Sequence, residues 1–396
     1  MKKTAIVSCY FQHNYGSMLQ AYATQMALDK LGYENETIDI SGFNHEIKRA
    51  KLCYFAKASL TSDILLSKLG MAKNVLIKKF SKNQYSSLSR VRAEKFDAFS
   101  SKHFRLSPEY TSKAELGSKC EDRYSNVLVG SDQLWLPGNI AADYYTLNFV
   151  PKTVNSIAYA TSFGQSTLPK DSAKKASIFL KKIKHIGVRE ESGQKLVKNL
   201  ANRDVPVVCD PTLLFTGNEW LDIQKPEPII DGKYILCYFL GNNPPHRKFA
   251  QRLKEKTGCK IVALAHLDEF VKSDEGYADV MPYDIDPADF LNLIRNAEYV
   301  CTDSFHCSVF SILYKRKFFT FRRYNGNTKQ STNSRLDTLF NLTGIKGRLM
   351  NGDEKIEECI EIRTDFENVY KKLESVREQS YEYLRRALED EGSTDL

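Results

Sequence analysis

The chain has 396 residues, of which 42% are hydrophobic and 27% are charged, and its net charge is +8. This composition is ordinary for a soluble globular enzyme, and no stretch approaches the ~20 apolar residues that cross a bilayer. Because one hydrophobic core rarely serves a chain of this length, we expect two domains.

The nine cysteines form no Cys-x-x-Cys pair, which excludes a zinc ribbon and a thioredoxin-like site. Several lie inside apolar runs, where cysteine packs as a small core residue, so a reducing cytosolic compartment is the simplest interpretation. The start, MKKTAIVSCYFQHNYG, has two lysines and an apolar run of strand length without a small-residue cleavage site. We expect a first β-strand here rather than an export signal.

Short apolar runs alternate with helical patterns through the first half of the chain. Strands are expected at TAIVSCYF, NETIDI, VLVG, SIAYAT, HIGVR and VVCDP. Helices are expected at LQAYATQMALDKLGY, where apolar residues recur every three or four positions, and at EESGQKLVKNL, which begins with acids. The alternation predicts a mostly parallel sheet in a Rossmann-like first domain, residues 1–217.

A basic helical insert interrupts this domain at residues 45–100. Between Lys48 and Arg92, eleven Lys or Arg stand against the single acid Asp63, so this segment carries +10 and the rest of the chain nets −2. Two interpretations stay open: a solvated helical pair whose cationic side chains cover apolar surface, or a segment that contacts an anionic membrane. No nucleic-acid-binding module accompanies the charge, so we expect no nucleic-acid partner.

A stretch rich in Pro, Gly and polar residues at 216–233 predicts a linker, after which the pattern restarts. Strands at YILCYFLG, CKIVAL, EYVCTD and KFFTF alternate with helices at PPHRKFAQRLKEKTG, DPADFLNLIRNA and CSVFSILYK. They predict a second Rossmann-like domain at 230–350. A long amphipathic helix at 364–392 is expected to pack across the first domain or to mediate a dimer. The predicted fold class is α/β, with two doubly wound domains facing a cleft.

Four loops carry polar residues directly after an expected strand, and such loops converge on one edge of a parallel sheet. They lie at 13–20, 130–135, 187–193 and 302–308. In the first, Asn14 and Gly16 precede a helix whose N-terminus suits an anion, although an ordinary turn fits them equally. Neither the dinucleotide fingerprint nor the P-loop fingerprint is present.

The second and third loops offer a carboxylate and a guanidinium. Asp132, which follows Ser131, is suited to orient a sugar hydroxyl or take its proton, or else to cap the next element. Arg189 matches a phosphate or carboxylate in bidentate fashion, or else pairs with Glu190 or Glu191.

The fourth loop places Asp303, Ser304 and His306 where a strand ends and a helix begins. A histidine there works as an acid or base near neutral pH, although a capping or core histidine is the common alternative. Several cations follow the next strand and form either an anion site or a flexible basic loop. They are Arg322, Arg323, Lys329 and Arg335.

These motifs, in order, resemble the polysaccharide pyruvyl transferase family over about residues 4–345. They are NYGSMLQAYA, VLVGSDQLW, SIAYATSFG, GVREESG, VVCDPTLLF, TDSFHCSVFS and NSRL. Cys307 departs from the glycine usual in the family, and the basic insert and last helix match only loosely. The resemblance implies a fold like that of GT-B glycosyltransferases. It also implies transfer of the pyruvyl unit of phosphoenolpyruvate to a sugar diol, which forms a cyclic ketal and releases phosphate.

The resemblance also implies roles for particular residues. His306 is expected to protonate the enol methylene, and an anionic donor would favour its imidazolium form. Arg189 and Arg335 are expected to clamp the donor's phosphate and carboxylate. Further polar contacts to the substrates are expected from Asn14, Ser131 and Ser304. Asp132 or Asp303 is expected to orient the acceptor, and neither a cofactor nor a metal is expected beyond phosphoenolpyruvate as donor substrate.

The acceptor is expected to be a sugar of a bacterial surface polysaccharide or its lipid-linked precursor. This places the protein in the cytoplasm, in peripheral contact with the inner membrane face through residues 48–92. Two other functions stay open: a GT-B-type nucleotide-sugar glycosyltransferase, and a non-catalytic envelope-assembly protein in which His306 would be dispensable. The sequence specifies no oligomeric state.

Overall fold

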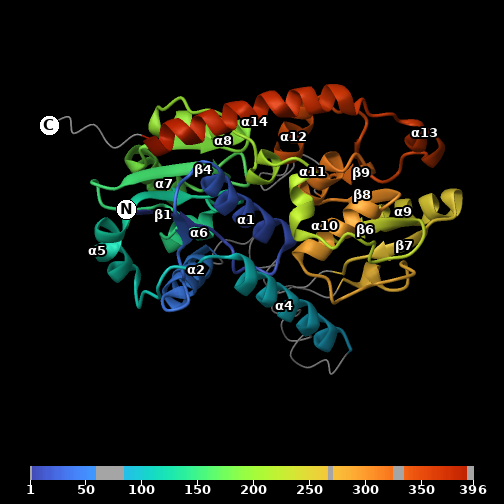
Figure 1. Cartoon of the computed structure of the whole chain (residues 1–396), viewed down its shortest axis with the longest axis horizontal. Helices are drawn as coiled ribbons and strands as arrows, with labels where there is room; N and C mark the ends of the chain where they lie inside the picture. Colours follow the sequence, from blue (N-terminus) through green and yellow to red (C-terminus); the bar gives the residue numbers. More distant parts are fainter. Residues whose placement is uncertain (1, 59–83, 266–270, 324–333, 390–396) are drawn as a thin grey trace.

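The computed structural model of the chain describes residues 2–58, 84–265, 271–323 and 334–389. Two parallel sheets lie side by side, each with its own helices, and a long helix spans both (Figure 1). The arrangement confirms the predicted α/β class with two Rossmann-like, doubly wound halves. No helix in these ranges is long and apolar enough to cross a membrane.

The first sheet has the strand order β2-β1-β3-β4-β5, with every neighbouring pair parallel. Its strands are β1 (Lys3–Val7), β2 (Asn35–Thr37), β3 (Tyr124–Val129), β4 (Asn155–Thr161) and β5 (His185–Val188). The associated helices are α1 (Tyr15–Lys30), α5 (Lys113–Arg123), α6 (Pro137–Ala142), α7 (Lys170–Lys182) and α8 (Glu191–Ala201). The inner strands are almost wholly buried, as expected where helices cover both faces of a parallel sheet.

The VVCDP run, which was expected as a strand, does not form one. Among the described residues, the VVCDP run makes a single bridge, between Val207 and Val188, and the 3-10 turn η1 (Pro211–Leu214) follows at once. Pro206 and Pro211 flank the run, and proline removes a ladder donor and favours a turn. The run therefore ends as a tight turn that holds Asp210 at the edge of the sheet.

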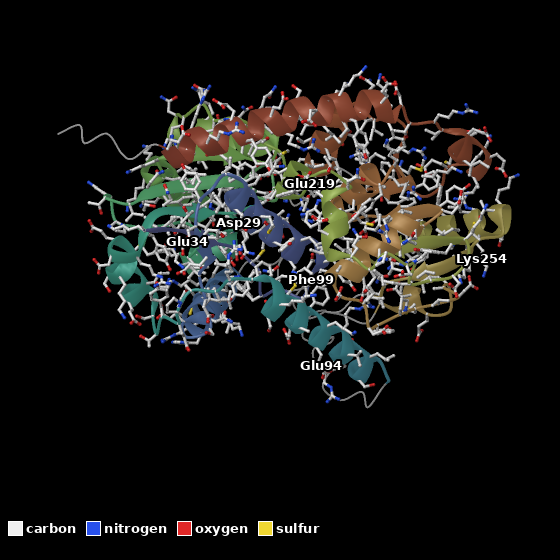
Figure 2. All side chains as sticks on the ribbon, in the orientation of Figure 1. Asp29, Glu34, Glu94, Phe99, Glu219 and Lys254 are labelled. Carbon is white, nitrogen blue, oxygen red and sulfur yellow. The ribbon has the colours of Figure 1, made fainter. Side chains whose placement is uncertain are left out.

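The described parts of the basic insert are helical, as α2 (Asn44–Ala58) and α4 (Gln84–His103). At one end of α4, Phe99 packs near Tyr22 of α1, with ring centroids 6.3 Å apart (Figure 2). Toward the other end, buried Arg92 donates to the carbonyl oxygens of Ala265 and Pro282 in the second half of the chain. Helix α4 therefore ties the two halves together.

The second sheet has the order β10-β9-β8-β6-β7, again all parallel. Its strands are β6 (Tyr234–Tyr238), β7 (Lys260–Ala263), β8 (Tyr299–Thr302), β9 (Lys317–Phe321) and β10 (Leu349–Met350). Its helices are α9 (Pro244–Thr257), α10 (Pro287–Asn296), α11 (Phe305–Leu313), α12 (Ser334–Thr343) and α13 (Ile356–Glu361). A 3-10 turn, η3 (Lys272–Asp274), lies between β7 and α10.

The two halves share a continuous apolar core. Tyr15 of α1 stacks on Phe290 of α10, with ring centroids 4.4 Å apart, and its hydroxyl donates to the Ile285 carbonyl oxygen. The segment expected as a linker contributes too, because it forms the 3-10 turn η2 (Glu219–Ile223). Buried Trp220 of this turn meets Phe310 of α11 edge-on at 5.1 Å. The connection is thus packed against both halves.

The last helix, α14 (Phe366–Glu389), runs over both halves (Figure 1). At its start, the Tyr370 hydroxyl donates to the Leu313 carbonyl oxygen at 2.6 Å. Further along, Ser380 accepts from the Cys209 amide at 3.0 Å, and the Ala387 carbonyl accepts from the Asn155 side chain at 2.7 Å. Of the two arrangements expected from the sequence, α14 adopts the one that packs back across the first sheet.

Candidate active site

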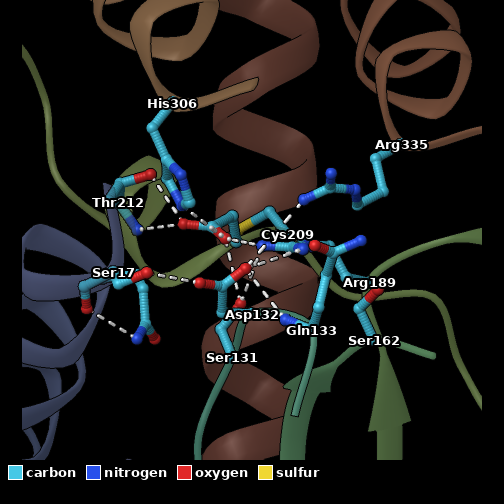
Figure 3. Close-up of polar contacts among 12 residues, drawn as sticks. Ser17, Ser131, Asp132, Gln133, Ser162, Arg189, Cys209, Thr212, His306 and Arg335 are labelled. Carbon is cyan, nitrogen blue, oxygen red and sulfur yellow. Dashed lines mark hydrogen bonds and ion pairs between the residues drawn. The ribbon is translucent and has the colours of Figure 1, made fainter. Parts of the chain in front are cut away.

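The polar loops meet between the two sheets, around a buried ion pair (Figure 3). Arg189 follows β5, and its Nη1 lies 2.7 Å from Oδ2 of Asp210, with both side chains at most 2% exposed. Ser131, directly beyond β3, donates to the same oxygen at 2.9 Å. Asp210 Oδ1 accepts from the amide and hydroxyl of Thr212. Asp210 is therefore the centre of this hydrogen-bond network.

Asp132 stands next to this ion pair in a strained backbone conformation. Its φ of +78° lies in the left-handed region, which is uncommon for a residue with a side chain and often marks a functional position. Its carboxylate accepts from the Ser17 hydroxyl at 2.7 Å and from the Gln133 amide at 2.8 Å. Arg189 Nη2 lies 3.6 Å and Arg335 Nη1 3.9 Å from the same carboxylate.

His306 reaches the cluster from the second half of the chain. It lies in the first turn of α11, and its Nε2 stands 3.4 Å from Asp210 Oδ2. On its other side is Gly16 of α1, where an added β-carbon would overlap the imidazole ring. The neighbouring ring of Phe305 lies 4.8 Å from the Arg189 guanidinium, a cation–π distance. The site is therefore assembled from both halves of the chain.

The two aspartates are held as carboxylates. Burial alone would raise the pKa of Asp132, but the charges of Arg189, His306 and Arg335 outweigh it and lower that pKa. The same competition lowers the pKa of Asp210, where burial is opposed by His306 and Arg189. Both groups are thus anionic at neutral pH.

The arginines differ in their electrostatic balance. Burial and the charge of Arg189 lower the pKa of Arg335 to about 10. Burial also acts against the charge on Arg189, but Asp210, Asp132 and Glu190 raise the pKa of Arg189 overall. Burial raises the pKa of Glu190, which accepts a 2.7 Å hydrogen bond from Ser162. Of these two arginines, Arg335 is therefore the one whose charge the surrounding protein compensates less.

Several donors of this cluster are left without a hydrogen-bond partner in the described part of the chain. They are Nε and Nη2 of Arg189, Nε of Arg335, Nε2 of His306 and Nε2 of Gln133. Buried polar groups are nearly always satisfied in folded proteins, and an unmet group is usually completed by a ligand or water. A set composed of cationic and amide donors suits an anion with many acceptor oxygens.

A cavity of about 290 Å³ opens on the other side of Asp132. The first half of the chain forms it, including the basic helix α2. The polar and aromatic residues on its wall are Gln12, Lys51, Phe55, Asp132, Gln133 and Asn139. Asp132 thus stands between the donor-rich cluster and this cavity.

The other expected site residues are engaged in local structure. Asp303 accepts from the Leu240 amide at 2.6 Å and the Gly241 amide at 2.8 Å, so its two carboxylate oxygens fix the loop after β6. Ser304 is the N-cap of α11, and Asn14 is the N-cap of α1. These residues hold the elements that carry His306 and Ser17.

Three residues of the cluster were not singled out from the sequence, namely Ser17, Gln133 and Asp210. Asp210 lies in the VVCDP run, directly after an apolar stretch, so the convergence argument used for the four loops applies to it as well. Within the described ranges, no group of three or more His, Cys, Asp or Glu is arranged to hold a metal ion.

Comparison with known proteins assigns the family. A family model for polysaccharide pyruvyl transferases matches residues 14–324. No curated protein matches the sequence. The chain therefore belongs to the polysaccharide pyruvyl transferase family, as its motifs predicted. Three solved structures are similar to it at low identity. One is a UDP-GlcNAc 2-epimerase from Methanocaldococcus jannaschii, with 14% identity over 96% of this chain and 100% of that chain and a TM-score of 0.49. Another is a putative UDP-N-acetylglucosamine 2-epimerase from Listeria monocytogenes, with 12% identity over 97% of this chain and 90% of that chain and a TM-score of 0.48. The third is the glycosyltransferase SnogD from Streptomyces nogalater, with 12% identity over 97% of this chain and 96% of that chain and a TM-score of 0.41.

Proposed function

We propose that the protein transfers the pyruvyl unit of phosphoenolpyruvate to two hydroxyls of a sugar, forming a cyclic ketal and releasing phosphate. One observation carries this proposal. The buried guanidinium groups of Arg189 and Arg335 keep N–H groups without partners, beside the imidazole of His306 and the carboxylate of Asp132. Phosphoenolpyruvate carries a phosphate and a carboxylate, the two groups that guanidinium binds best.

His306 is the proposed general acid. Protonation of the donor's methylene carbon creates an electrophilic centre at the adjacent carbon, which one sugar hydroxyl attacks. The second hydroxyl then displaces phosphate. The atoms balance, because the two hydroxyl protons end on the new methyl group and on the departing phosphate. The neighbouring Asp210 carboxylate, 3.4 Å from Nε2, stabilises the imidazolium that this step requires.

Asp132 is proposed to orient the acceptor hydroxyl and to stabilise positive charge at the reacting carbon. Because the surrounding cations lower its pKa, its carboxylate is a weak base, better suited to these roles than to removing a proton. Of the two expected aspartates, we choose Asp132 for this role. The oxygens of Asp303 are already occupied by backbone amides.

The experiment measures phosphate release from phosphoenolpyruvate with a panel of nitrophenyl hexoside and lipid-linked acceptors. The wild type and His306→Ala are compared. Acceptor-dependent release that disappears in the variant supports pyruvyl transfer. If nucleotide sugars raise the melting temperature and phosphoenolpyruvate does not, the protein is a glycosyltransferase instead. If neither ligand has an effect, a non-catalytic binding role is the better account.

We further propose that the protein works at the inner face of the cytoplasmic membrane, where lipid-linked acceptors are found. Helix α2 exposes Leu52 (69%), and Lys48 and Arg49, one turn before it, are exposed as well. Apolar side chains bordered by cations suit an anionic lipid surface. The remainder of the basic segment, residues 59–83, lies outside the described residues.

A further inference from the structure

The cavity beside Asp132 has the lining of a carbohydrate site. Gln12, Gln133 and Asn139 contribute side-chain amides, which both donate to and accept from hydroxyls. Phe55 contributes an aromatic ring, and ring faces pack well on the C–H faces of sugars. The volume of about 290 Å³ lies at the lower end of the range for ligand pockets, about 300–1,000 Å³, so it suits one sugar unit.

The cation in this cavity is Lys51. It projects from the inward face of α2, and the ammonium has no ion pair or hydrogen bond with any described residue. Partial burial lowers its pKa, which reflects the loss of hydration of its charged form. Lys119, by contrast, is exposed and pairs with Glu115 at 2.5 Å. Because buried charges in proteins are normally paired, a half-buried ammonium without a partner among the described residues suits an anion from outside the chain.

The wall that carries Lys51 is held close to the rest of the cavity. Gly138 of α6 faces α2, and a β-carbon there would stand 3.2 Å from Cζ of Phe55. This glycine permits α2 to approach α6 directly. Lys51 and Phe55 are thereby placed on the same cavity as Asp132, whose role in the proposed function is to orient the acceptor.

We propose that this cavity is the acceptor subsite, and that Lys51 pairs with an anionic group on the acceptor sugar. That group is either a carboxylate on the sugar ring or a phosphate on its anomeric oxygen. The inference rests on the proposed function, because it assumes that two substrates bind on opposite sides of Asp132. The acceptor binds on the side of α2, and the donor binds on the side of Arg189 and Arg335. It makes Lys51 a residue that determines acceptor specificity.

The test measures direct binding, without phosphoenolpyruvate, by calorimetry. The ligands are a neutral nitrophenyl hexoside, the corresponding nitrophenyl hexuronide and the hexose 1-phosphate, so the two sources of negative charge are separated. The proteins are the wild type, Lys51→Gln, Lys51→Arg and Lys48→Gln. The last is a matched control, because Lys48 is an exposed lysine of the same helix and does not line the cavity.

We expect the wild type to bind at least one of the anionic ligands about tenfold more tightly than the neutral hexoside, as one charged hydrogen bond provides. Lys51→Gln should lose this preference, whereas Lys51→Arg and Lys48→Gln should keep it. The inference is overturned if the preference survives in Lys51→Gln. It is likewise overturned if neutral and anionic ligands bind alike, or if none of them binds.

A parallel thermal-shift titration with phosphoenolpyruvate separates this inference from the proposed function. Stabilisation of the wild type and of Lys51→Gln to the same extent is the expected result. Loss of the phosphoenolpyruvate effect in Lys51→Gln would assign Lys51 to the donor and overturn the inference. Absence of the effect in the wild type would contradict the proposed function, while the calorimetry would still decide whether the cavity selects anionic sugars.

Discussion

The imidazole of His306 lies so close to Gly16 that a β-carbon at position 16 would overlap its ring. The two residues belong to different halves of the chain, Gly16 to α1 and His306 to α11. Any side chain at position 16 would therefore displace the imidazole from Asp210. Position 16 has the ordinary backbone of a helix, so it does not need glycine for its backbone angles. It needs glycine because a side chain would occupy the space of the imidazole.

Gly16→Ala is accordingly expected to inactivate the enzyme while leaving it folded. We expect acceptor-dependent phosphate release to fall by about 10²-fold or more, because a proton donor that moves by an ångström loses its geometry. Gly193→Ala is the matched control. It also replaces a helical glycine, and its nearest neighbour would be 3.5 Å away, an ordinary contact. Equal activity of the two variants would refute the positioning role of Gly16.

His306→Gln tests the acid itself with a side chain that still offers an N–H group toward Asp210 but cannot transfer a proton to carbon. Removal of a general acid typically lowers the rate by about 10²–10⁴-fold, so kcat for phosphate release should fall within this range. The exposed His45, substituted in the same way, should have no effect. If kcat in His306→Gln stayed within about twofold of the wild type, another group would have to supply the proton.

Asp210→Asn is expected to destabilise the protein, and the loss should depend on pH. Breaking a buried ion pair removes about 3–5 kcal/mol, here by leaving Arg189 without its 2.7 Å partner. Because the folded-state pKa of Asp210 lies below the unfolded value of about 3.9, the carboxylate stabilises the fold above that pH. This stabilisation decreases as the pH falls below about 4.

Denaturant unfolding at pH 7, pH 5 and below pH 4 measures this effect. The difference in unfolding free energy between the wild type and Asp210→Asn should be largest at the higher pH values and should shrink as the pH falls below about 4. A difference that stays constant over the whole range would mean that the ionised Asp210 contributes no more than a neutral amide.

The sequence was informative where a residue's role follows from its local position. The period of apolar residues located the strands, and the rule that loops after parallel strands converge brought Asp132, Arg189 and His306 into one cluster. Arg335, whose surroundings also fitted a flexible loop, lies in the first turn of α12 and points toward Asp132.

The remaining site residues depend on contacts that no local pattern encodes. Asp210 precedes a proline, and Asp-Pro is a common turn dipeptide. From the sequence alone, an aspartate that pairs with Arg189 could not be distinguished from one that only shapes a turn. Ser17 lies in the first turn of α1, where a serine usually has only a local role. Asp303 and Ser304, which the same position rule selected, use their side-chain oxygens to bind backbone amides in the structure, so their part in the site stays a prediction.

The protein is expected to bind anionic vesicles through α2 at low ionic strength and to release them at high salt, because salt screens the attraction between its lysine and arginine side chains and the lipid headgroups. The double substitution Lys48→Gln/Arg49→Gln should weaken flotation with such vesicles. The control is Lys174→Gln/Lys175→Gln, which removes the same charge from exposed positions on α7. Failure of the wild type to float with anionic vesicles at low salt would reject a membrane-surface role.

Arg92 of α4 is expected to stabilise the contact between the two halves of the chain. Its guanidinium is fully buried and donates to backbone oxygens of Ala265, Pro282 and Tyr283, and it lies 5.0 Å from the Tyr283 ring. Arg92→Met keeps much of the side-chain volume but leaves three carbonyls short of a donor. Each such buried group costs about 1–3 kcal/mol, so a lower melting temperature is expected.

The matched control is Arg90→Met on the same helix. The side chain of Arg90 is 79% exposed and pairs with Glu94 at 3.4 Å, and surface pairs of this kind contribute about 0–1 kcal/mol. Hydrogen exchange around residues 282–285 should accelerate in Arg92→Met and remain unchanged in Arg90→Met. Because His306 and the Asp132 cluster come from opposite halves, Arg92→Met should also reduce phosphate release, although Arg92 has no contact with the cluster. Similar melting and exchange in the two variants would show that α4 does not fasten the halves together.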